Sequence, residues 1–186
     1  MKLGPISFID QKERNIILRS AEPSDAELLL HYLRMTAAET PYLIREPDEI
    51  TLTLEQEEAF ISRVAASEKD LMLIAVTEGR HIGNCSLSAV GPFRRYAHRC
   101  EVAIALYRAY CGAGIGTRML QTVLDIASEL GYEQAELEVV STNKNALALY
   151  RKAGFMQYGE LPNNMKYADG TYADVYWMMK KLRPAE

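Results

Sequence analysis

A chain of 186 residues is long enough for one full hydrophobic core and short for two. Its composition, 48% hydrophobic and 25% charged, is typical of a soluble globular protein. With 21 Lys and Arg against 25 Asp and Glu, the net charge of −4 argues against electrostatic binding of nucleic acid. The three cysteines lack C-x-x-C spacing, so the sequence indicates neither a disulfide framework nor a metal site.

The sequence also lacks the features of a membrane or secreted protein. Residues 1–10 contain no long apolar segment of the signal-peptide type. No apolar run in the chain approaches the length of a membrane span. We therefore expect a cytoplasmic protein that does not bind membranes.

The first part of the chain predicts one strand and two helices. A short apolar run predicts a strand at residues 15–19. The sequence Ser24-Asp25-Ala26-Glu27 fits a capping box, so a helix is expected to start just after Pro23 and to fray near Met35. A loop is then expected at residues 39–53 and a second helix at 53–67.

The second part predicts strands alternating with two helices. One helix follows the glycines at 112–116 and ends before Gly131, and the other spans 143–153 and ends at Gly154. Strands or extended segments are expected at 71–77, 81–90, 100–106, 135–140, 155–160 and 172–180, the last after an Asp169-Gly170 turn. Without repeats or linkers, residues 1–186 are expected to form a single mixed α/β domain.

Residues 111–117, CGAGIGT, carry the strongest functional signal. Glycines at 112, 114 and 116 stand between an apolar strand and an amphipathic helix. Glycine accepts the dihedral angles of a tight loop and lets a bulky ligand approach the main chain. The free amides and the dipole of a helix start attract anions. The stretch therefore predicts a phosphate-binding loop, with a tight turn that binds nothing as the alternative.

Two other glycine motifs can be compared with this loop. The dinucleotide motif G-x-G-x-x-G is not met, because position 117 is Thr. An acid at Glu136 or Glu138 does follow at a suitable distance, but only about seventy residues remain, too few for a full dinucleotide fold. No Gly-Lys-Ser/Thr follows, which excludes a P-loop.

A second motif, NKNALALYRKAGF, occupies residues 143–155. With the glycine loop before it, the sequence closely resembles the GNAT superfamily of N-acetyltransferases. Residues 112–117 are similar to that family's acetyl-CoA pyrophosphate loop, Gln/Arg-x-x-Gly-x-Gly/Ala, and residues 143–155 to its N-x-x-A-x-x-L-Y-x-K-x-G-F segment. The usual opening and close of the family also match, so the resemblance covers nearly the whole chain. Cys111 departs from the pattern, since the family has Gln or Arg there, and a side-chain contact to the phosphates is expected to be missing.

The resemblance implies the GNAT fold, a single mixed, mostly antiparallel sheet flanked by helices. It also implies direct transfer of acetyl from acetyl-CoA to a primary amine in a ternary complex, with no metal. Asn143 would contact coenzyme A, and its role as the N-cap of its helix is an equally good and compatible interpretation. The strand before the loop would pair with the pantetheine arm, and an amide near Leu106 would polarise the thioester. The remaining implied donor-binding residues are Ile104, Ala105, Leu106, Gly112, Ala113, Gly114, Ile115, Gly116 and Thr117.

Three side chains are candidates for the chemistry. The resemblance assigns Tyr150 as the general acid for the leaving thiolate, although it also lies on an apolar helix face and could be a core aromatic. Glu101 is the best-placed carboxylate for a general base, because burial there would raise its pKa; an outward, solvated glutamate is the alternative. Glu39 could bind a cationic amine, with a plain surface carboxylate as the alternative.

Several alternatives stay open. Cys111 could carry an acyl group covalently, since a helix start can lower a thiol pKa, but no histidine lies near it in sequence. A silent acetyl-CoA-binding sensor and a nucleotide-cofactor oxidoreductase are the other functional classes. The acceptor could be a small-molecule amine or a peptide N-terminus, and a homodimer is left open. Residues 39–53 and 162–167, both expected as loops, should select the acceptor.

Overall fold

The computed structural model describes residues 1–182, which contain eight strands and four α-helices. The strands are β1 (Ile6–Ile9), β2 (Asn15–Ser20), β3 (Leu71–Thr77), β4 (Arg80–Ala89), β5 (Arg99–Leu106), β6 (Gln134–Val140), β7 (Met156–Lys166) and β8 (Tyr172–Lys181). The helices are α1 (Ala26–Glu39), α2 (Leu54–Ala66), α3 (Ile115–Glu129) and α4 (Lys144–Lys152). None of these helices combines the length and the apolar character needed to cross a bilayer.

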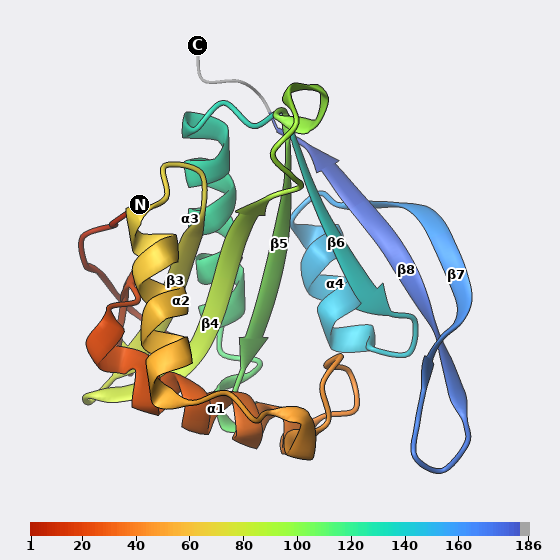
Figure 1. Ribbon diagram of the computed structural model, residues 1–186, viewed down its shortest axis with the longest axis horizontal. Coiled ribbons are helices and arrows are strands. Elements are labelled where there is room, and N and C mark those ends of the chain that lie inside the picture. The colour runs from red at the N-terminus through yellow and green to blue at the C-terminus, as the bar shows by residue number, and fades with distance from the viewer. Residues whose placement is uncertain (183–186) are drawn as a thin grey trace. The chain divides into compact units, whose positions relative to one another are not determined.

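The strands form one sheet in the order β1-β2-β3-β4-β5-β6-β8-β7 (Figure 1). β5 and β6 pair in parallel, whereas β1–β2, β2–β3, β3–β4, β6–β8 and β7–β8 are antiparallel. This confirms the predicted mixed α/β fold with a mostly antiparallel sheet. The chain divides into two compact units. Unit 1 comprises Met1–Ser88 and Ala103–Val123, and unit 2 comprises Ala89–Val102 and the described part of Leu124–Glu186.

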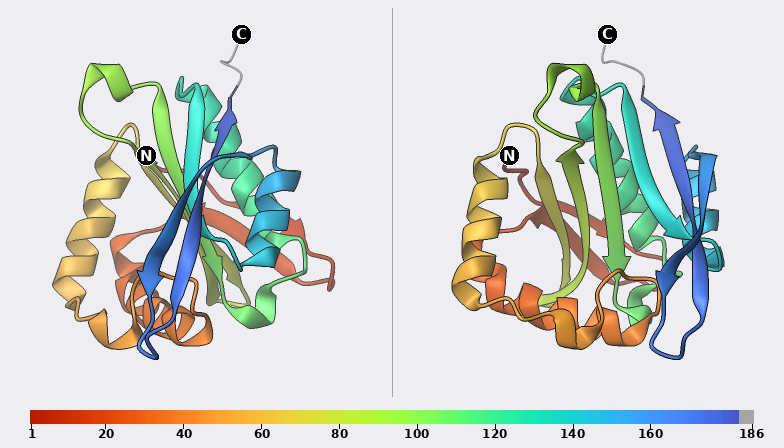
Figure 2. Two further views of the ribbon diagram at one scale, coloured as in Figure 1. Left: turned by 90° about the vertical axis from the view of Figure 1, so that its right-hand side faces the viewer. Right: turned by 45° about the vertical axis from the view of Figure 1, so that its right-hand side comes forward.

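In unit 1, helices cover both faces of the strands (Figure 2). Side chains alternate across a strand, so Met72 and Ile74 of β3 point to one face, where they pack with Leu29, Tyr32 and other residues of α1 and α2. Leu71 and Leu73 point to the other face, which is also fully buried. The start of α3 lies on that face and buries its own apolar stripe, Ile115, Met119 and Val123.

Unit 2 contains helix α4, the start of β5 and the strands β6, β8 and β7 (Figure 1). Strands β7 and β8 form a long antiparallel hairpin. The parallel β5–β6 pair places Glu101 opposite Glu136. The register of β7 against β8 is irregular between Gln157 and Gly159. A Cβ on Gly159 would lie 2.9 Å from the Trp177 ring, so glycine is what allows these two strands to approach there.

Four expectations about local structure differ from the structure. Residues 6–9 form a strand that was not predicted, and α1 continues to Glu39 instead of fraying near Met35. The capping box at 24–27 does not form; instead Pro23–Asp25 is a short 3₁₀ turn, and the Asp25 carboxylate accepts from the Glu22 amide at 2.8 Å. Asp25 is also held by Arg19 at 2.7 Å, which is a tertiary contact that local sequence does not reveal. Residues 162–166, expected as part of a loop, belong to β7.

Gly83 of β4 is required by a close approach of β5. A Cβ at this position would lie 2.8 Å from Leu106 Cγ and 3.1 Å from the Ala105 carbonyl oxygen. We therefore expect Gly83→Ala to lower the free energy of unfolding by about 1–3 kcal/mol, because the Leu106 side chain and the main chain of β5 must shift to make room for the added methyl group. Gly4→Ala is the control, since nothing lies within 4 Å of the Cβ it would add. Urea unfolding followed by circular dichroism measures both, and equal stabilities would contradict the close approach.

His81 of β4 has a buried imidazole ring. Its ring packs edge-on against Tyr32 with centroids 4.5 Å apart, and within the described residues neither ring nitrogen has a hydrogen-bond partner. Burial lowers the pKa of His81 to about 4, against the opposing attraction of Asp25. The folded state therefore holds a neutral imidazole at pH values where the unfolded chain, with a histidine pKa of about 6.5, is already protonated.

This difference predicts a pH-dependent stability. Between pH 7 and pH 5 only the unfolded chain takes up the His81 proton, so acid should lower the stability of the wild type by ~1–2 kcal/mol through this group. His81→Phe keeps an aromatic ring against Tyr32 and should lack that part of the loss. Urea unfolding at the two pH values checks this. An equal pH dependence in both proteins would show that His81 does not titrate as inferred.

Candidate functional site

The glycine loop lies in unit 1 between a 3₁₀ turn, η4 (Arg108–Tyr110), and the first residue of α3. Gly112 and Gly114 have φ values of +73° and +84°, in the left-handed region that only glycine enters at little cost. The Ala113 carbonyl accepts from the Gln11 amide at 3.1 Å, and the Gly114 carbonyl accepts from the Arg118 amide at 3.1 Å. These two hydrogen bonds between the loop and its surroundings are accepted by carbonyl groups of the loop, whereas an anion-binding loop holds its ligand through amides.

The end of β5 leads into this loop and is held on its β4 side. The Tyr107 amide donates to the Ile82 carbonyl of β4 at 3.1 Å, and the Tyr32 hydroxyl donates to the Ala105 carbonyl at 2.7 Å. Main-chain polar groups alternate sides along a strand, so those of Ile104 and Leu106 point away from β4. Burial raises the pKa of Tyr32, which keeps its phenol neutral and able to donate.

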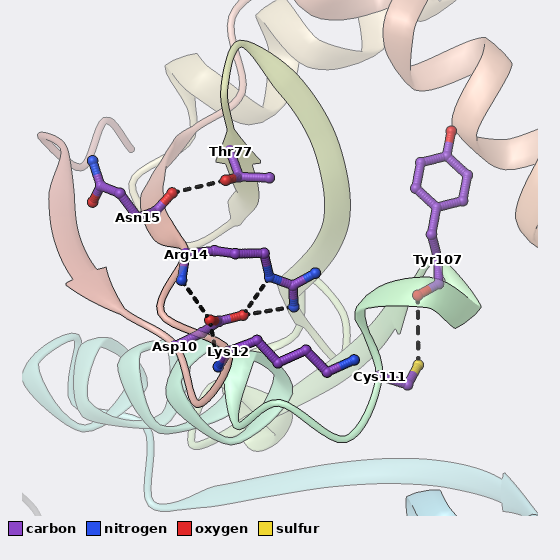
Figure 3. A network of polar contacts seen from close by, with 7 residues as sticks. All are labelled: Asp10, Lys12, Arg14, Asn15, Thr77, Tyr107 and Cys111. Atoms are coloured by element: carbon purple, nitrogen blue, oxygen red, sulfur yellow. Dashed lines mark hydrogen bonds and ion pairs between the residues drawn. The ribbon is translucent and has the colours of Figure 1, made fainter.

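Cys111 lies just before the glycines and is exposed. Its thiol donates to the Tyr107 carbonyl at 3.6 Å (Figure 3). Partial burial raises the pKa of Cys111, and the Glu39 carboxylate raises it further. An acyl-carrying cysteine needs a lowered pKa, so this environment opposes the covalent mechanism.

Glu39 is the last residue of α1. The sequence had placed it in the loop that follows. Its carboxylate accepts from the Arg108 amide at 2.7 Å, at the start of η4. Glu39 therefore helps to shape the segment that leads into the glycine loop. Its predicted contact with an acceptor amine would have to use the oxygen that faces away from η4.

Glu101 belongs to unit 2 and lies among other carboxylates. Glu136, opposite it on β6, is bound by both Nε and Nη2 of Arg99. Glu138 accepts from the Trp177 indole at 2.9 Å. Partial burial raises the pKa of Glu101, and the charges of Glu136 and Glu138 raise it further, against the effect of Arg99. A carboxylate with a raised pKa is better suited to accept a proton near neutral pH.

Asn143 and Tyr150 lie in unit 2 at α4. The Asn143 side chain accepts from the Ala146 amide at 3.2 Å, which confirms its predicted role as the N-cap. Tyr150 is buried, and its ring tilts against Phe155 with centroids 5.9 Å apart. Tyr150 therefore packs as a core aromatic residue, and this packing holds the ring that carries its hydroxyl group.

The candidate residues fall in both units. Unit 1 brings together Glu39, the end of β5 and the glycine loop, whereas Glu101, Asn143 and Tyr150 belong to unit 2. Sequence analysis missed Tyr32, which looks like an ordinary core residue of α1. It also missed the β1–β2 turn that bonds to the loop, although the alternation of Ile6, Ser7 and Phe8 was a weak strand signal. Within residues 1–182, no group of three or more His, Cys, Asp or Glu residues is placed to hold a metal.

Known proteins resemble this chain in sequence and in fold. N-alpha-acetyltransferase RimI of Mycobacterium tuberculosis is 34% identical over 125 residues, which cover 66% of this chain and 73% of that protein. The chain spans only 33% of another relative, the uncharacterized protein ML0378 of Mycobacterium leprae, at 32% identity. A GNAT-family acetyltransferase of Streptococcus pneumoniae superimposes with a TM-score of 0.85 at 29% identity, covering 89% of this chain and 99% of that one.

A further solved structure is a GNAT superfamily phosphinothricin acetyltransferase of Sinorhizobium meliloti in complex with acetyl-CoA. It has a TM-score of 0.78 at 21% identity and covers 91% of this chain and 92% of its own, so it shows the shared fold. The sequence model of the acetyltransferase (GNAT) domain matches residues 15–156, a range that includes β5, the glycine loop and α4. The chain therefore belongs to the GNAT acetyltransferase family.

Proposed function

We propose that this protein is an acetyl-CoA-dependent N-acetyltransferase that moves an acetyl group directly to a primary amine in a ternary complex. The observation that carries the proposal is the glycine loop at the start of α3, where Gly112 and Gly114 have left-handed φ values and the carbonyl groups of Ala113 and Gly114 accept hydrogen bonds within the protein. We further infer that the two units act as a single domain, because the family match at 15–156 runs through both.

The donor would bind along the end of β5 and the glycine loop. The amides of residues 112–117 would hold the diphosphate of acetyl-CoA. The outward main-chain groups of Ile104 and Leu106 suit an extended pantetheine arm, which can pair with a strand as a peptide does. In that arrangement the Leu106 amide would donate to the thioester oxygen and stabilise the oxyanion that forms there. The complex of the Sinorhizobium meliloti relative with acetyl-CoA supports this choice of donor.

The chemistry requires one base and one acid. Glu101, with its raised pKa, would accept a proton from the amine, directly or through water, so that the neutral nitrogen attacks the thioester carbon. As the carbon–sulfur bond breaks, the Tyr150 hydroxyl would protonate the departing thiolate and yield coenzyme A. Asn143 would contact the donor while it caps α4.

The acceptor is a small-molecule amine or a peptide N-terminus. Both classes occur in the names of related proteins, N-alpha-acetyltransferase for one and phosphinothricin acetyltransferase for another. Glu39 would attract the cationic amine before it loses its proton. Residues 39–53 and the β7 segment at 162–166 would then shape the acceptor site.

Replacing the acid tests both the activity and its mechanism. Thiol release from acetyl-CoA should occur with some members of a panel of small amines and peptide N-termini. Tyr150→Phe should lower kcat by roughly 10²–10⁴-fold, the usual size of general-acid catalysis, while the ring still packs on Phe155. Tyr158→Phe, an exposed tyrosine of the same unit, is the control. An unchanged rate would remove Tyr150 from the mechanism. Acetyl-CoA binding without any transfer would point to a sensor instead.

Filling the glycine loop tests donor binding. Gly114→Trp should raise the Kd for acetyl-CoA by about 100-fold or more, because a bulky side chain would occupy the approach to the amides. Gly170→Trp is a matched control, since Gly170 has the same φ of +84° in the β7–β8 turn. Both variants carry similar backbone strain, and only a side chain at 114 would also meet a neighbour, Gln11. Calorimetry then compares the affinity of the two variants for acetyl-CoA. Retained affinity in Gly114→Trp would show that the loop is only a turn.

A further inference from the structure

Cys111 makes donor binding at the glycine loop unusually dependent on main-chain shape. If the amides of residues 112–117 hold the diphosphate, position 111 offers them no charged or amide side chain as help. Amides bind an anion well only when they converge on it, and an error of about 1 Å in position can be costly. Whatever fixes the shape of this loop therefore affects donor affinity.

The turn between β1 and β2, residues 10–14, is the part of unit 1 that contacts the loop. The Gln11 amide donates to the Ala113 carbonyl at 3.1 Å. The Gln11 side chain lies over Gly114, with its Nε2 3.4 Å from the place that a Cβ on Gly114 would take. The Arg14 guanidinium stacks on Tyr110, 4.6 Å from the ring centre. These contacts reach Ala113 and Gly114 of the loop and Tyr110 in the η4 turn just before it.

This turn is itself rigid, because the buried Asp10 carboxylate organises it (Figure 3). Asp10 accepts from the amides of Lys12 and Arg14, each at 2.9 Å, and from the Arg14 guanidinium at 2.6 and 2.8 Å. Burial alone would raise the pKa of Asp10, but the bonds from Arg14 and the amides outweigh it and hold the pKa below its ordinary value. Asp10 is therefore charged at neutral pH and keeps Arg14 aligned over Tyr110.

We propose that residues 10–14 are a positioning element for the donor's diphosphate. The Gln11 contacts and the Arg14–Tyr110 stack hold the left-handed glycines in place, so the amides converge without help from position 111. This inference rests on the proposed function, because it assigns a role toward the acetyl donor. It concerns residues that act through the loop and do not themselves touch the reacting atoms.

Two variants remove the side-chain contacts and leave both the Asp10–Arg14 pair and the main-chain bond from Gln11 to Ala113 intact. Gln11→Ala removes the side chain over Gly114, and Tyr110→Leu removes the stack. Glu13→Gln is the matched control, because the Glu13 amide bonds within the turn, to the Asp10 carbonyl, and its side chain is changed by one atom. Calorimetry measures the Kd for coenzyme A. Steady-state kinetics compares acetyl-CoA with S-acetylpantetheine, a donor that lacks the diphosphate.

We expect Gln11→Ala and Tyr110→Leu each to raise the Kd for coenzyme A by about tenfold. Their kcat/KM should fall by a similar factor with acetyl-CoA and stay within about twofold with S-acetylpantetheine, since that donor does not use the loop. A merely structural role would lower both rates together, and that result would overturn the inference. So would an unchanged Kd. If the wild type failed to bind coenzyme A, the proposed function itself would fall.

Discussion

The shape of the glycine loop in unit 1 depends on which main-chain groups of residues 112–117 form hydrogen bonds within the protein. A loop that binds an anion must keep its amides free of protein partners, yet a loop without partners would not hold one shape. Here the carbonyl groups of Ala113 and Gly114 take the hydrogen bonds that fix the segment. The left-handed angles at Gly112 and Gly114 let the chain turn tightly into α3.

The same arrangement occurs at the end of β5. Tyr32 and Ile82 bond to one side of the strand, and the absence of a side chain at Gly83 lets Leu106 approach closely. In the proposed complex, the main-chain groups on the other side of the strand bind the donor. Two neighbouring segments are thus anchored on one side only, and the proposed path of the donor follows their other sides.

Much of this could be predicted from sequence, where the signals are local. The apolar run at 71–77 became β3 with its predicted limits, and α2 lies within the range 53–67 predicted for it. The glycine loop and Asn143 were recognisable because closely spaced glycines favour a tight loop and an asparagine before a helical segment favours an N-cap. Contacts between distant segments were not predictable. Nothing in the sequence says that the Gln11 amide donates to the Ala113 carbonyl, that Glu39 accepts from the Arg108 amide, or that Arg19 pairs with Asp25.

The single tryptophan of the chain, Trp177, lies on β8 in unit 2. Its indole bonds to Glu138, and its ring stacks near Tyr158 at 6.3 Å, so its environment is set by the β7–β8 hairpin and its neighbours. Tryptophan emission, excited where tyrosine does not absorb, therefore reports on the surroundings of Trp177 in unit 2. The exposed thiol of Cys111 offers a place to attach an optical probe beside the glycine loop in unit 1.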